Sequence, residues 1–337
     1  MNLKKLTKRT EFYVLVALIV LCVVIQARSG QFFTGNNLVD LARSLVVPAM
    51  FCVGEMLVLV SGGIDVSFPA IASVSMFVVS KHMEWYQGSV AVHLAVGTLL
   101  GLAMGSVNGF LIAKYRFNAF LVTLGTASVY TGVLFGALSA KKYPVPAPMY
   151  DLGKAGLFTA SNEGLGIHST MPVTVLFFVA LLVVAWFLLR RTMLGRGIYA
   201  LGGDAVAAER CGFNIFRTQM FIYCFVGALA GFMGVVRACM MLNCNPTTLN
   251  GMEMTCIAAC VLGGASITGG RGTLLGVMLG ITLITVMSTN LILLGISTYW
   301  QKVFTGLIIL VGTGVPAFQF LRNQRRLVAK SGGNGNV

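Results

Sequence analysis

The chain has 337 residues, of which 57% are hydrophobic and only 10% charged, and its mean hydropathy is +0.86. A soluble domain of this length cannot hide so much apolar surface from water, so the composition excludes an ordinary soluble enzyme and predicts a membrane protein. The net charge of +14 does not require nucleic acid as a partner, because basic loops facing anionic inner-leaflet lipids account for it.

Apolar segments alternate with polar ones along the whole chain, which predicts an all-α polytopic fold with about ten transmembrane helices. Three of the segments, the first, third and eighth, are short for a full crossing, so about eight to eleven spans are compatible with the pattern. The predicted spans are 12–27, 44–61, 66–80, 90–113, 120–138, 173–189, 218–236, 253–266, 274–294 and 299–321.

Basic residues are distributed unevenly between the predicted loops. If the N-terminus is inside, most Lys and Arg residues fall on the cytoplasmic side, including those within 4–9, 190–217 and 322–330. This bias predicts an N-in, C-in topology. We assign 1–327 to one transmembrane domain and expect the Gly- and Asn-rich tail, 328–337, to be disordered.

Few polar side chains lie within the predicted spans, where each is costly unless it faces protein or water. Between the second and third spans, two glycines are followed closely by Asp65, so the backbone turns sharply and its freed N–H groups need partners. We expect a hinge there. For Glu55 the alternative is a structural hydrogen bond to a neighbouring helix, and for Asn108 a bond across helices. The candidates for the hinge or translocation path are Glu55, Gly62, Gly63, Asp65 and Asn108, with Gly263 and Gly264 of a similar later turn.

Small residues recur every four positions in the fourth predicted span, at Gly97, Gly101, Gly105 and Gly109. Such a stripe is typical of close helix packing, with a substrate lining as the alternative. In the same span we expect His93 to be packed and hydrogen-bonded. The eight cysteines and three histidines show no metal-ligand spacing, and we expect Cys239 and Cys244 to be free thiols rather than a disulfide.

A polar loop, residues 190–217, separates the sixth and seventh spans. The pair Gly202-Gly203 breaks the chain, Asp204 can cap a helix and Gly212 fits the position after its end, which predicts a short helix over 205–211. Such an exposed helix is suited to docking another protein, although a capped amphipathic linker has the same pattern. The candidate contact residues are Gly202, Gly203, Asp204, Val206, Ala207, Ala208, Glu209, Arg210 and Gly212.

This loop resembles the cytoplasmic loop that faces the ATPase in permease subunits of ribose-type monosaccharide importers of the ATP-binding-cassette class. Two further segments are similar to family motifs: SGGIDVS at 61–67 and LGGASITGGRG at 262–272. After the first motif the family continues Val-Gly, whereas this chain has Phe68-Pro69, which predicts a stiffer turn. The residues of the polar loop that match are Gly195, Arg196, Tyr199, Ala200, Gly202, Gly203, Asp204, Ala207, Ala208, Gly212 and Phe213.

The resemblance implies a type II-like importer permease in the bacterial inner membrane. It further implies a cytoplasmic ATPase, a periplasmic sugar-binding protein and a second permease copy or paralogue as partners, within membrane lipids. We expect no catalytic residue, cofactor or metal, since the chain has no phosphate-binding GxxxxGK[ST] loop, zinc spacing or GxSxG elbow. Motion of the loop is expected to reach the sixth and seventh spans. The alternative function is an ion-coupled secondary transporter using Glu55 and Asp65.

Overall fold

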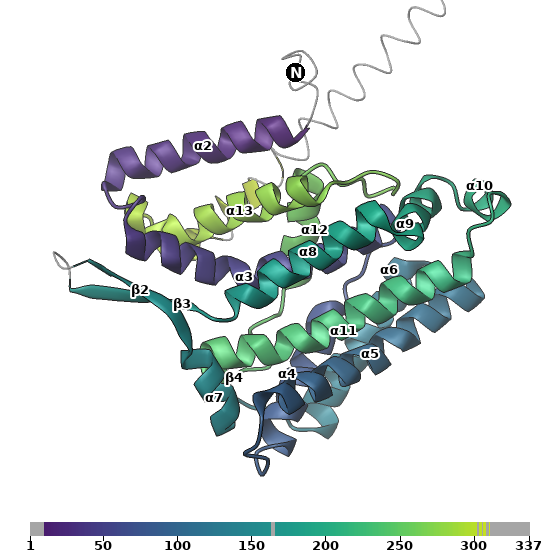
Figure 1. Ribbon diagram of the computed structural model, residues 1–337, viewed down its shortest axis with the longest axis horizontal. Coiled ribbons are helices and arrows are strands. Elements are labelled where there is room, and N and C mark those ends of the chain that lie inside the picture. Colours follow the sequence, from purple (N-terminus) through teal and green to yellow (C-terminus); the bar gives the residue numbers. More distant parts are fainter. Residues whose placement is uncertain (1–9, 163–165, 302, 305, 308–309, 311–337) are drawn as a thin grey trace, which may run out of the picture.

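The computed structural model describes residues 10–162, 166–301, 303–304, 306–307 and 310 (Figure 1). Within them the chain is mostly helical. The longer helices are α2 (Thr10–Ser29), α3 (Gly35–Val60), α4 (Phe68–His82), α5 (Val90–Tyr115), α6 (Ala119–Gly132, continued by a π-helical turn at Val133–Ala137), α8 (Val175–Arg191), α11 (Ile215–Met241), α12 (Met252–Leu262) and α13 (Leu274–Asn290).

Shorter elements connect these helices. They are α7 (Ala147–Lys154), α9 (Met193–Gly203), α10 (Ala205–Arg210), the strands β1 (Tyr143–Pro144), β2 (Gly156–Asn162), β3 (Ile167–Pro172) and β4 (Asn243–Cys244), and 3-10 turns at Ile292–Leu294 and Thr298–Trp300. The strands form two antiparallel two-stranded sheets, β1–β4 and β2–β3. The expectation of an all-α chain therefore missed the β2–β3 hairpin and the short β1–β4 pairing between segments distant in the sequence.

Among the described residues, five helices are long and apolar enough to cross a membrane: α2, α3, α5, α6 with its π-helical turn, and α11. A sixth arises if α8 and α9, which meet at an angle of 72°, are counted as one bent span. The third, eighth and ninth predicted spans are the shorter helices α4, α12 and α13, of 15, 11 and 17 residues. The glycine turn that begins at Gly263 ends α12, and a 3-10 turn at Ile292–Leu294 follows the end of α13. The last predicted span, the basic N-terminal residues and the tail 328–337 lie wholly or mostly outside the described residues.

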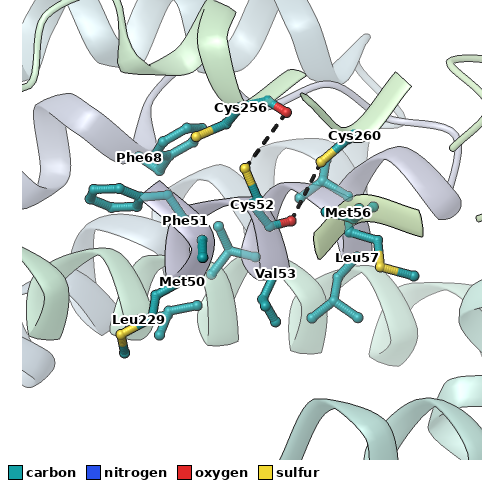
Figure 2. Close-up of a cluster of buried hydrophobic side chains, with 14 of the residues drawn as sticks. Met50, Phe51, Cys52, Val53, Met56, Leu57, Phe68, Leu229, Cys256 and Cys260 are labelled. Atoms are coloured by element: carbon teal, nitrogen blue, oxygen red, sulfur yellow. Dashed lines mark hydrogen bonds between the residues drawn. The ribbon is translucent and has the colours of Figure 1, made fainter. Parts of the chain in front are cut away.

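Helix α3 forms the centre of the molecule. In its most apolar window 78% of the residues are buried, against 11% in each of α2 and α6. The cysteine-bearing face of α3 packs on α12, where Cys260 Sγ donates to the Cys52 carbonyl at 3.5 Å (Figure 2). Helix α2 lies outside, beside α13, and its Glu11 accepts a bond of 2.7 Å from Thr273 Oγ1.

The glycine stripe of α5 packs against α11, as expected from its spacing. A Cβ on Gly101 would overlap the Gly227 carbonyl oxygen, and a Cβ on Gly105 would overlap that of Tyr223. The backbones of the two helices are therefore in direct contact, which only glycine allows.

The expectation for His93 was wrong in part. The side chain is fully buried and its ring lies 5.4 Å from that of Tyr86, but neither ring nitrogen has a hydrogen-bond partner within the described residues. The expectation of free thiols at Cys239 and Cys244 is confirmed.

Candidate functional site

The polar loop contains two helices rather than one. Helix α9 begins at the cap Thr192, whose Oγ1 accepts from the Gly195 amide at 3.0 Å, and it runs through Gly202 and Gly203. The chain breaks at Asp204 instead, where the backbone becomes extended. The expected break at the glycine pair was therefore wrong, because a close tertiary contact, rather than a turn, requires Gly202.

Helix α10 has both of its predicted ends. Asp204 Oδ1 accepts from the amides of Val206 at 2.8 Å and Ala207 at 3.0 Å. At the other end Gly212 takes a φ of +87°, and the amides of Gly212 and Phe213 bond back to Glu209 and Ala208 in a Schellman motif. A helix fixed at both ends holds its side chains in defined positions although it has fewer than two turns.

One face of α10 is free. Ala208 is buried against the rest of the molecule, whereas Val206 is 58% exposed and Ala207, Glu209 and Arg210 are exposed as well. Beside this face lies a hollow of about 420 Å³, lined in part by Ala113, Arg116, Glu209, Phe213 and Phe216. Arg116 Nη2 lies 3.8 Å from Glu209 Oε2 across it, and because both side chains are exposed this ion pair adds little stability.

The segment between α3 and α4 is a defined turn followed by a buried polar network. Gly62 has a φ of +87°, and the amides of Gly62 and Gly63 bond to the carbonyls of Leu59 and Val58 in a second Schellman motif. Gly63 has no left-handed backbone; its Cβ would instead come within 2.7 Å of Tyr223 Oη. At this turn Gly62 is therefore required for its left-handed backbone conformation. Gly63 is required because there is no space for a Cβ beside Tyr223.

Asp65 anchors the network that follows. Its Oδ1 accepts from both the amide and the hydroxyl of Ser67 at 2.6 Å, and Asn108 Nδ2 of α5 donates to Ser67 Oγ at 2.8 Å. Thr123 of α6 accepts from the Val66 amide and donates to the Ile64 carbonyl. The bond across helices expected for Asn108 is confirmed, and the broken segment is tied to α5 and α6.

Glu55 lies next to this network and is fully buried. Its Oε1 accepts a long bond of 3.5 Å from the Asp65 amide, and its Oε2 has no partner among the described residues. Glu55 and Asp65 are therefore neighbours, as the sequence pairing suggested. Both are shielded from solvent in this conformation, so neither lines an open path here.

The later glycine turn repeats the geometry of the first. Gly264 has a φ of +92°, and the amides of Gly264 and Ala265 bond to Val261 and Cys260. The equivalent of Gly62 is therefore Gly264. Aligning the two Gly-Gly pairs in the sequence would instead match Gly62 with Gly263, one residue earlier. Gly263 has a different role, because a Cβ there would overlap the Gly276 carbonyl of α13.

Neither region holds a metal site among the described residues, where no three His, Cys, Asp or Glu side chains gather. The loop 263–273 reaches across to α9, so that Gly62, Gly202 and Gly269 lie together (Figure 1). The arrangement combines an exposed helix that is capped at both ends with backbone contacts that lead inward to the turn between α3 and α4.

Comparison with known proteins gives a consistent match. A family model described as "Branched-chain amino acid transport system / permease component" matches residues 37–312. The ribose import permease protein RbsC of Escherichia coli strain K12 is 33% identical over 297 residues, 88% of this chain and 90% of that protein. The L-arabinose ABC transporter permease protein AraH of Azospirillum brasilense is 33% identical over 314 residues, 93% and 88%. RbsC of Bacillus subtilis strain 168 is 31% identical over 296 residues, 87% and 88%. No solved structure matches the chain.

Proposed function

The chain belongs to the family of permease components described for branched-chain amino acid transport systems, and from this premise we propose that it is the membrane-spanning subunit of an ATP-binding-cassette importer for a monosaccharide or a sugar-like solute. The observation that carries the choice of cargo is the similarity, over about nine tenths of the chain, to permeases named for ribose and L-arabinose. A transporter of this kind is not an enzyme, and its ATP hydrolysis takes place on a partner.

The charge pattern supports a neutral cargo. Glu55 and Asp65 are the buried carboxylates beside the hinge, and both are enclosed by neighbouring helices. Arg237 lies near one end of α11 rather than at its middle. An anionic cargo would call for basic groups facing the path at mid-membrane, because fixed charge in the membrane is costly unless it serves the solute.

The ion-coupled alternative depends on Glu55 and Asp65. The oxygen Oδ1 of Asp65 is already occupied by two bonds from Ser67, and the family match assigns the energy source to an ATPase. We therefore place these residues in the hinge rather than in an ion path.

For topology we propose about ten spans in the bacterial inner membrane, with both termini and the polar loop in the cytoplasm. In support, α10 and the β2–β3 hairpin lie at opposite ends of the long helices (Figure 1), as a loop and a hairpin on opposite membrane faces would. Exposed apolar side chains on α2, α6 and α8 need covering. Lipid and a second permease copy or paralogue would provide that cover.

The direct test is uptake by proteoliposomes that contain the permease with its ATPase and its binding protein. We expect ATP-dependent accumulation of a radiolabelled pentose or hexose, unchanged when a protonophore collapses the proton gradient. Labelled leucine is the matched control for the family description and should not accumulate. Accumulation of leucine in place of sugar, or loss of uptake with the protonophore, would contradict the proposal.

A second prediction concerns docking of the ATPase on α10. Cys211, the residue that follows α10, is the single exposed cysteine of the eight, and the others are buried or half-buried. A membrane-impermeant maleimide should therefore label Cys211 in inside-out vesicles and not in right-side-out vesicles, and bound ATPase should protect it. Cys211→Ser is the control for site specificity. Labelling from the outside would refute the topology, and equal labelling with and without ATPase would refute the docking site.

A further inference from the structure

The carbonyl oxygen of Val60, the last residue of α3, is a meeting point of three segments. It accepts a hydrogen bond of 2.9 Å from the Gly270 amide in the loop after α12. The Cα of Gly202 in α9 lies so close to the same oxygen that a Cβ would overlap it. The end of α3, the end of α9 and the later glycine loop thus touch through their backbones, without side chains between them.

Two further contacts close this junction, which consists of residues 60–62, 199–203 and 269–272. A Cβ on Gly269 would lie 2.6 Å from the Gly202 carbonyl oxygen and 2.8 Å from the Cα of Gly62. The half-buried Tyr199 donates its hydroxyl to the Gly272 carbonyl at 2.9 Å. Tyr199 is the one side chain of α9 that ties that helix to the loop by a hydrogen bond within the described residues.

Helices α3 and α12 reach this junction as a paired unit. Cys52 lies opposite Cys256 and Cys260 along the shared face (Figure 2), and thiol bonds of 3.9 and 3.5 Å join them. Thiols are weak donors, so tight packing rather than bond strength holds the pair. Because interiors are close-packed and change arrangement in discrete steps, a push on one member displaces the other.

We propose, resting on the proposed function, that Tyr199 is a positioning residue for coupling and that the junction delivers motion of the docking helix to the ends of α3 and α12. From the sequence, motion of the loop is expected to reach the sixth and seventh spans, which correspond to α8 and α11. In the structure α9 also contacts residues 60–62, which directly precede the Asp65 network. A displacement of α9 therefore reaches the hinge between α3 and α4 directly.

The test is Tyr199→Phe in the complete complex of permease, ATPase and binding protein, measuring sugar uptake and ATP hydrolysis in the same vesicles. The change removes one hydrogen bond and keeps the ring, so the sugar imported per ATP should fall roughly two- to tenfold. Hydrolysis and the melting temperature of the permease should stay at wild-type values. Tyr115→Phe is the matched control, because Tyr115 is 52% exposed at the end of α5.

The outcomes separate the two proposals. Wild-type vesicles that hydrolyse ATP but import no sugar would remove the proposed function and this inference with it. If wild type imports sugar and Tyr199→Phe imports the same amount of sugar per ATP hydrolysed, this inference is overturned and the proposed function stands. A parallel loss of uptake, hydrolysis and melting temperature would also overturn it, because that result indicates a merely structural role. An equal loss in Tyr115→Phe would have the same meaning.

Discussion

Gly202→Ala should abolish ATP-driven sugar uptake, whereas Gly203→Ala should leave it intact. The two glycines are the last residues of α9, but a Cβ on Gly202 would overlap the Val60 carbonyl and come within 2.6 Å of the Gly270 amide, while Gly203 faces open space. Replacing glycine by alanine within a helix favours folding by about 0.5–1 kcal/mol at either site. At Gly202 the overlap outweighs that gain, since overpacking against backbone costs about 1–3 kcal/mol or more.

The measurement is uptake in proteoliposomes, normalised to the amount of inserted permease. ATP hydrolysis is recorded in parallel, because the α10 face proposed to dock the ATPase is unchanged in both variants. If the two alanine variants import sugar at equal rates, the contact between α9 and α3 has no part in coupling.

Gly101→Ala should destabilise the permease by disrupting the backbone contact between α5 and α11. Its Cβ would overlap the Gly227 carbonyl and lie 2.7 Å from the Gly231 amide nitrogen, so the two helices must separate. We expect a loss of about 1–3 kcal/mol or more in the free energy of unfolding. Gly125→Ala on α6, where a Cβ meets no atom within 4 Å, should have no such cost.

Thermal unfolding of the purified permease in detergent, followed by the loss of folded protein with temperature, measures both variants. A Gly101→Ala protein that melts with wild type and with Gly125→Ala would show that the helices can repack without loss.

Local signals explain what could be predicted from the sequence. The caps of α10, Asp204 and Gly212, act within a few residues of the helix, so their spacing predicted its ends closely. The glycine stripe of α5 has a fixed helical period and predicted a packing face. The partner of Asn108 was placed across helices because an amide in a span needs a bond, but only the fold identifies Ser67.

The predictions that failed concern features set by contacts between residues that are distant in the sequence. A Gly-Gly pair is typical of a chain break, but Gly202 lies within α9 and is glycine because the Val60 carbonyl leaves no space for a Cβ. The correspondence of Gly62 with Gly264 follows from the hydrogen bonds of the two turns. An alignment of the two Gly-Gly pairs misses it, because Gly263 is the first glycine of the later pair. His93 carries no local sign that its ring nitrogens would lack partners. The glycine turn after α12 likewise ends that helix before the predicted end of its span.

The position of α2 and α3 has a consequence for biogenesis. These helices leave the ribosome before α12 and α13, but α2 packs on α13 and the cysteine face of α3 packs on α12. During synthesis α2 and α3 therefore lie in lipid without their final neighbours until α12 and α13 have been made. Glu55 of α3 is not yet enclosed by these neighbours during that time. Contacts so distant in the chain form late. A chain that stops before residue 252 would thus insert its early helices without the neighbours that cover them in the folded protein.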